Sequence, residues 1–118
     1  MARGTRASFR RERIAVESVA IHFAGTCELA LWCKLLRDRG WTGPQIARSL
    51  CRSEGYVNNL IRILERSSLA VLMRWKLEQE PASGLPAVCA TDWLMQVCVL
   101  PHDEQDRELA SRAARLAR

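Results

Sequence analysis

The chain has 118 residues, a formal net charge of +5 and an apolar fraction of 48%, so it can form one core and favours a polyanionic partner. Its longest apolar run is far below the roughly 18 residues of a membrane span, and its basic start lacks the apolar stretch of a secretory signal. The five cysteines form no Cys-x-x-Cys pair, and neither histidine lies near a cysteine at zinc-finger spacing, so we expect no bound metal and no cofactor. We expect the cysteines to be reduced thiols in a cytoplasmic protein.

Residues 1–13, MARGTRASFRRER, are rich in arginine and contain almost nothing to bury. This composition predicts a mobile basic arm in the free protein. Such an arm can follow DNA phosphates or enter a minor groove, and its candidate contacts are Arg3, Arg6, Arg10 and Arg11. A solvated tail that only aids solubility fits equally well. Residues 14–118 are predicted to form a single all-α domain.

Residues 14–23, IAVESVAIHF, are apolar nearly throughout and fit either a short helix or a strand. We predict a helix that serves as a packing or dimer segment. The next helix is predicted over residues 27–39, capped by Thr26 and ended by Gly40. Its expected buried face consists of Leu29, Trp32, Cys33, Leu35 and Leu36.

Residues 43–62, GPQIARSLCRSEGYVNNLIR, predict a helix, a tight turn and a second helix. Thr42 and Pro44 indicate the start of the first helix, and Ser53 is a good N-cap for the second. Cys51 occupies the turn, where glycine is the usual residue. Small or apolar residues lie where two steeply crossing helices must touch: Ile46, Ala47, Leu50, Cys51, Val57, Leu60 and Ile61. Ala47 is expected at the closest approach.

The polar positions of the second helix predict a surface that could contact DNA. Asparagine can pair with adenine through two hydrogen bonds, and arginine can reach guanine or the phosphate backbone. We therefore expect a DNA-binding helix-turn-helix over residues 43–64; an ordinary helical hairpin in an all-helical core is the alternative. The candidate contacts are Arg52, Ser53, Glu54, Tyr56, Asn58, Asn59 and Arg62.

Beyond this stretch, Ser67 or Ser68 is expected to cap a helix that runs to about residue 78. Residues 81–86 form the clearest predicted loop, and Thr91 is expected to cap a helix over residues 92–99. A last helix is predicted over residues 103–117. Its acidic residues lie towards the N-terminal end and its arginines towards the C-terminal end, which is the arrangement that the helix dipole favours. Along the helix that ends near residue 78, Leu69, Leu72, Met73 and Leu77 are apolar at helical spacing. Met73 and Trp75 are expected to pack in the core or at an interface.

The stretch LLRDRGWTGPQIARSLCRSEGYVNNLIRILE resembles the helix-turn-helix domain of the ParB family of partition proteins and related plasmid repressors. The resemblance is carried by Gly40, Ile46, Ala47, Ser53, Tyr56, Val57, Asn59, Leu60, Ile61 and Arg62. A weaker resemblance to the family's Leu-Pro-x-x-x-Gln region includes Leu100, Pro101, Asp103, Glu104 and Gln105. Phe9, Arg10 and Arg11 lack the glycine of the family's Gly-x-x-Arg-Arg motif, so we do not expect its nucleotide-binding domain or CTP chemistry.

The resemblance implies site-specific binding of double-stranded DNA, with transcriptional regulation or partition left open. The charge pattern agrees with this expectation, because both ends and residues 34–74 are basic while residues 75–106 are acidic. We expect a nucleoid-associated homodimer that belongs to a bacterial plasmid, phage or mobile element. The alternative is a protein-interaction module that works through residues 75–106 or 14–23. No glycine loop or histidine arrangement indicates an enzyme.

Overall fold

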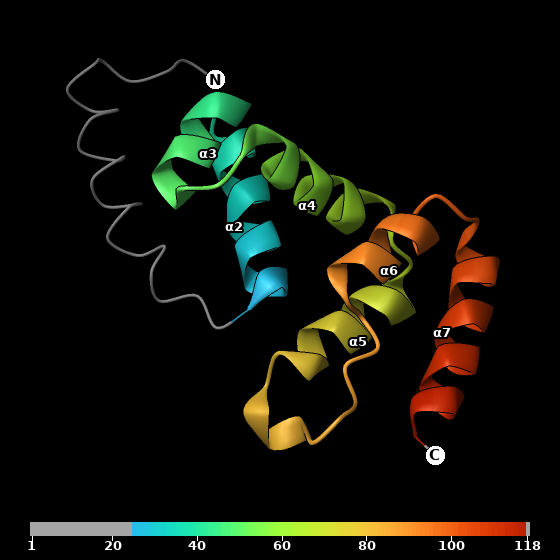
Figure 1. Ribbon diagram of the computed structural model, residues 1–118. Helices are drawn as coiled ribbons and strands as arrows, with labels where there is room; N and C mark the ends of the chain where they lie inside the picture. Colours follow the sequence, from blue (N-terminus) through green and yellow to red (C-terminus); the bar gives the residue numbers. More distant parts are fainter. Residues whose placement is uncertain (1–24, 118) are drawn as a thin grey trace.

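The computed structural model describes residues 25–117, in which the fold is all-α as predicted, without strands (Figure 1). The predicted arm at residues 1–13 and the predicted helix at residues 14–23 lie outside this part of the chain. Within it, no helix is both long and apolar enough to span a bilayer. The elements are α2 (Thr26–Asp38), α3 (Gly43–Leu50), α4 (Glu54–Arg66), α5 (Leu69–Glu78), the 3₁₀ helix η1 (Pro81–Ser83), α6 (Thr91–Val97) and α7 (His102–Leu116).

Three of the helices begin at a polar side chain that accepts a bond from their first turn. Thr42 accepts from the backbone N of Gln45 at 3.3 Å, and the Gln45 side chain accepts in return from the backbone N of Thr42 at 2.9 Å. Ser53 and Ser68 cap α4 and α5 in the same manner, through one bond each. These caps confirm the predicted helix starts, because each satisfies a backbone N–H that has no partner within its own helix.

Two other predicted caps are wrong. Gly25 is the N-cap of α2, and the hydroxyl of Thr26 instead accepts a hydrogen bond from Trp75 Nε1 at 3.1 Å. Ala90 is the N-cap of α6, so Thr91 lies inside that helix. The Thr26 hydroxyl is used in this way because the buried indole N–H of Trp75, on a distant helix, needs an acceptor. The sequence around Thr26 gives no indication of this contact.

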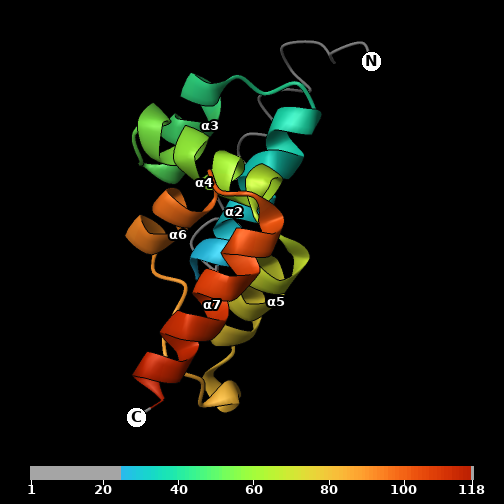
Figure 2. The same ribbon diagram turned by 90° about the vertical axis from the view of Figure 1, so that its right-hand side faces the viewer.

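The helices pack as two groups joined by α4. α2 and α3 lie against α4 in the upper part of both views, while α5, α6 and α7 fill the lower part (Figures 1 and 2). Contacts between α2 and α5 and between α4 and α6 make the core continuous across the two groups. Its largest fully buried side chains include Trp75, Leu36, Ile46, Leu60, Ile61, Ile63 and Leu94.

α5 buries Trp75, which was expected in the core or at an interface, but exposes three of the four apolar residues noted at helical spacing. Val71 and Trp75 are completely buried, whereas Leu69, Met73 and Leu77 are exposed by 73, 56 and 45%. Both sides of this helix carry apolar residues, so periodicity could not distinguish the inner side from the outer one. Leu35 on α2 is likewise exposed, while Ala30 takes a core position in its helix.

The connection between η1 and α6 is held by charged side chains. Glu78 is nearly buried, pairs with Arg74 at 2.6 Å and accepts bonds from the backbone N atoms of Val88 and Cys89. From the other side, Arg112 of α7 donates to the carbonyl of Val88 at 2.9 Å and lies over the ring of Trp93. Arg112 therefore has a specific packing role, which its position near a helix end did not reveal.

Gln105 joins the C-terminal half to α4. This side chain on α7 is completely buried, and its Oε1 accepts from the backbone N of Ser68 at 2.7 Å. Its Nε2 donates to the carbonyls of Arg66 at 3.0 Å and Leu100 at 2.9 Å, with a longer contact to Cys98 at 3.4 Å. One amide thus connects the end of α4, the start of α5 and the turn before α7.

Candidate nucleic-acid interface

A tight turn of three residues joins α3 to α4. The backbone N of Arg52 donates to the carbonyl of Ala47 at 3.0 Å, and the backbone N of Cys51 donates to that of Arg48 at 3.2 Å. The bond from Arg52 turns the chain back towards α3 and accompanies a left-handed conformation of Cys51, with φ of 54°. Among residues 25–117 it is the only residue other than glycine with positive φ. The turn therefore keeps the geometry of a glycine turn although the glycine is missing.

The two helices bury most of the contact residues that the sequence predicted. Ile46 and Ala47 on α3, and Val57, Leu60 and Ile61 on α4, all lie in the core. Leu50 is only half-buried, and the side chain of Cys51 is exposed, so the prediction that Cys51 lies in the helix contact is wrong.

The outer side of α4 carries polar residues one helical turn apart. Asn58 and Arg62 are exposed, and Asn59 lies half-buried at the edge of the same surface. Arg66 continues this row by one turn and is also exposed. We call Asn58, Asn59, Arg62 and Arg66 the outer face of α4. Neither arginine forms an ion pair with a carboxylate of residues 25–117, so both guanidinium groups are available to an anion.

The N-terminal end of α4 adds a second group of candidate contacts. Arg52 is exposed, and its guanidinium carbon lies 5.3 Å from the ring centroid of Tyr56, within range of a cation–π interaction. Tyr56 is half-buried and packs against the core, which gives Arg52 a fixed support. Ser53 is exposed, but its hydroxyl oxygen already caps the helix.

Glu54 faces the start of α3. A Cβ placed on Gly43 would lie 2.9 Å from Glu54 Oε1, so this carboxylate rests against the glycine. There it is close to the positive end of α3, where a carboxylate is stabilised by the helix dipole. This position fits a role in joining the two helices better than a contact with DNA, for which the sequence had nominated Glu54.

α6 borders the outer face on one side. Burial raises the pKa of the Cys98 thiol, and the positive charges of Arg66 and Arg62 partly offset the increase. On the other side, Glu65 pairs with Lys34 at 3.6 Å, and Lys34 also pairs with Asp38 at 3.0 Å. The negative charge of Glu65 is thus neutralised close to the outer face.

The comparisons with family models, with curated proteins and with solved structures found no match for this chain. The candidate interface therefore depends on its own residues and geometry.

The structure brings Arg52, Tyr56, Asn58, Asn59 and Arg62 together on α4 and the turn before it. Sequence reasoning had not selected Arg66, although its spacing of four residues from Arg62 was a usable signal. It had also not selected Arg48, which is exposed on α3. The candidate arm contacts Arg3, Arg6, Arg10 and Arg11 lie outside the described residues, and no metal-binding cluster of acidic, histidine or cysteine residues occurs within residues 25–117.

Proposed function

We propose that the protein binds double-stranded DNA sequence-specifically and that the outer face of α4 enters the major groove. The observation that carries this proposal is the outer face itself, in which exposed amide and guanidinium groups stand on a helix whose other side is fixed by the core. A major groove about 12 Å wide accommodates one α-helix. Asn58 and Asn59 have the chemistry to read adenine, and Arg62 has the chemistry to read guanine or bind phosphate.

Electrostatic attraction supports the same function. Arg48 and Arg52 are exposed on α3 and on the turn, and neither is paired with a carboxylate of the described chain. Together with Arg62 and Arg66 they would place positive charge around a docked duplex, which strengthens binding and makes it depend on salt. We infer a homodimer on a palindromic site, because one short helix contacts few bases and dimers read two half-sites about one helical turn apart.

The biological role that fits best is that of a transcriptional regulator or partition-type DNA-binding protein of a bacterial plasmid, phage or mobile element. This part of the proposal depends on the resemblance of residues 35–65, and more weakly of residues 100–105, to ParB-type proteins. The alternative, an interaction module that uses its acidic segment, is supported less well. Three acidic side chains of this segment already have partners within the chain. Glu78 pairs with Arg74, Asp103 pairs with Arg107, and Asp106 accepts a hydrogen bond from the Ser68 hydroxyl.

The first experiment is selection of binding sites from a random duplex pool at low and near-physiological salt. Recovery of one motif at both salt concentrations is expected, and a palindromic motif would indicate the dimer. Sequence-independent binding that disappears with salt would contradict specific readout and favour the interaction module.

Variants then locate the readout. Asn59→Ala and Arg62→Ala should each weaken binding to the selected site by about 1 to 3 kcal/mol. Arg115→Ala removes the same charge from the exposed end of α7 and is the matched control. It should change affinity little at physiological salt. Equal losses in Arg62→Ala and Arg115→Ala would show that α4 is not the reading helix.

Gly55→Ala separates binding from folding. A Cβ at Gly55 would meet no atom within 4 Å, so the fold accepts alanine there. If the start of α4 approaches the DNA backbone closely, the added methyl group should weaken binding while thermal stability stays equal or rises. Unchanged affinity would place this end of α4 away from the duplex.

A further inference from the structure

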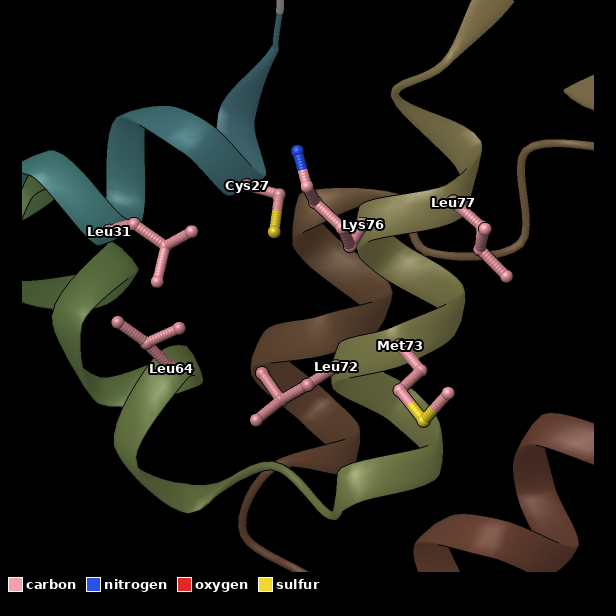
Figure 3. A pocket seen from close by; sticks show the side chains of 7 residues that line it. All are labelled: Cys27, Leu31, Leu64, Leu72, Met73, Lys76 and Leu77. Carbon is pink, nitrogen blue, oxygen red and sulfur yellow. The ribbon is translucent and has the colours of Figure 1, made fainter. Parts of the chain in front are cut away.

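An apolar groove lies between α2, α4 and α5, away from the outer face of α4. Leu31, Leu64 and Leu72 point towards one another from the three helices, as Figure 3 shows. The groove has a volume of about 400 Å³ and is lined by Cys27, Leu31, Leu64, Leu72, Met73, Lys76 and Leu77. Among the described residues that line it, only Lys76 is charged, and its ammonium group pairs with Glu28 at 3.3 Å. Its walls otherwise offer apolar contacts alone.

The groove continues into exposed apolar surface on both sides. Leu31 and Leu35 on α2 are exposed by 47 and 50%, and Leu69, Met73 and Leu77 extend the surface along α5. A large continuous apolar surface of this kind generally marks a site that another segment or partner covers. Leucine and methionine side chains gain several favourable contacts when such a surface is buried.

The described chain begins at this groove. A Cβ on Gly25 would lie 1.6 Å from Gln79 Oε1, so the Gly25 backbone is pressed against the residue that follows α5. The same oxygen accepts from the backbone N of Cys27 at 3.3 Å. Residues 14–23 are therefore attached to the chain where Lys76 and Leu77 line the groove. A side chain at position 25 would require the Gln79 side chain to move.

Residues 14–23 also have suitable chemistry. Val16, Val19, Ala20 and Phe23 recur at helical spacing and would form one apolar stripe. Ten residues can extend roughly 33 Å, which is more than enough to reach across helices that pack about 8 to 10 Å apart. Because the segment is tethered, its effective concentration at the groove is of the order of millimolar, well above that of a second copy in dilute solution.

We propose that residues 14–23 of the same chain bind in the groove between α2, α4 and α5 through the stripe that contains Val16, Val19 and Phe23. Hydrogen exchange of the full-length protein, followed by mass spectrometry at several protein concentrations, tests this assignment. The backbone amides of residues 14–23 should exchange at least about tenfold more slowly than in a synthetic peptide of residues 1–24, and dilution should not change their rate.

Two variants connect this protection to the groove. Val19→Asp and Met73→Asp should each return residues 14–23 to the exchange rate of the free peptide. Val99→Asp is the matched control, because Val99 is 62% exposed and does not line the groove. It should keep the protection. Val19 lies outside the described helices, so Val19→Asp should leave the slow amides of α7 unchanged, which shows that the loss is not general unfolding.

Three results would overturn the assignment. Exchange of residues 14–23 at the rate of the free peptide would mean that the groove is not covered by this segment. Protection that disappears on dilution would identify a second copy of the chain as the occupant. Protection that persists in both aspartate variants would mean that residues 14–23 pack at another place. None of these results depends on whether the protein binds DNA.

Discussion

Replacing Gln105 by methionine should remove the junction between α4, α5 and α7 without opening a cavity. Methionine has nearly the same length and volume as glutamine but cannot replace its hydrogen bonds. The Oε1 of Gln105 accepts from the backbone N of Ser68 at 2.7 Å, and its Nε2 donates to the carbonyl of Leu100 at 2.9 Å. Ser68 is 3% exposed, so water cannot readily replace the lost acceptor.

The expected loss follows from these bonds. A buried donor or acceptor left without a partner costs about 1 to 3 kcal/mol, so two such groups cost about 4 kcal/mol. Burying a methionine in place of an amide returns about 1 kcal/mol. We therefore expect Gln105→Met to lower the free energy of unfolding by about 3 kcal/mol, a large part of the roughly 5 to 15 kcal/mol of a typical domain.

Urea unfolding followed by tryptophan fluorescence and by far-UV circular dichroism measures this loss. Gln96→Met is the matched control, because Gln96 is exposed on α6 and should change stability by less than about 0.5 kcal/mol. If Gln105→Met unfolded at the same urea concentration as the parent protein with the same slope, the buried amide would not hold these helices together.

Three further measurements test the fold. Cys51→Gly should raise the free energy of unfolding by about 1 kcal/mol, because φ of 54° is unfavourable for cysteine and free for glycine; a lower urea midpoint would contradict this. Ala47→Leu should lower it by about 1 to 3 kcal/mol by overfilling the core between α3 and α4, and full stability would disprove their close contact. Burial raises the pKa of Cys33 to about 11 and, with the charge of Glu78, that of Cys89 to about 12, against 9.0 for an unperturbed thiol. The folded state then keeps protons that the unfolded state loses, so stability should fall as pH rises from about 9 towards 12 and be unaffected below 9; Cys33→Ala should make that fall shallower, and an unchanged slope would contradict the assignment.

Some features of the fold were accessible from short stretches of sequence. Thr42 and Ser53 cap helices as predicted, Ser68 is the cap of α5 out of the two serines considered, and Gly40 follows the end of α2 with φ of 95°. Each of these signals acts on backbone groups within about four residues, so the local sequence contains all the partners involved. The contact between α3 and α4 could be predicted for the same reason, because a short turn restricts which faces of two helices can meet. The residues that make this contact are Ile46, Ala47, Val57, Leu60 and Ile61.

The polar surface of α4 was predictable for a related reason. Once Val57, Leu60 and Ile61 are buried, helical geometry alone turns Asn58 and Arg62 outward. The position of Glu54 against Gly43 was not predictable, because it depends on how α3 crosses the start of α4.

The sequence by itself determined where most of these helices begin and end, since capping and turn formation are local. Only the tertiary structure decided that Trp75 faces inward while Met73 remains outside, because α5 has apolar residues on both sides and its neighbours select one. The bond from Trp75 to Thr26 and the four contacts of Gln105 were decided in the same way. A buried polar group needs a partner, and that partner is set by which distant segments the packed core brings together.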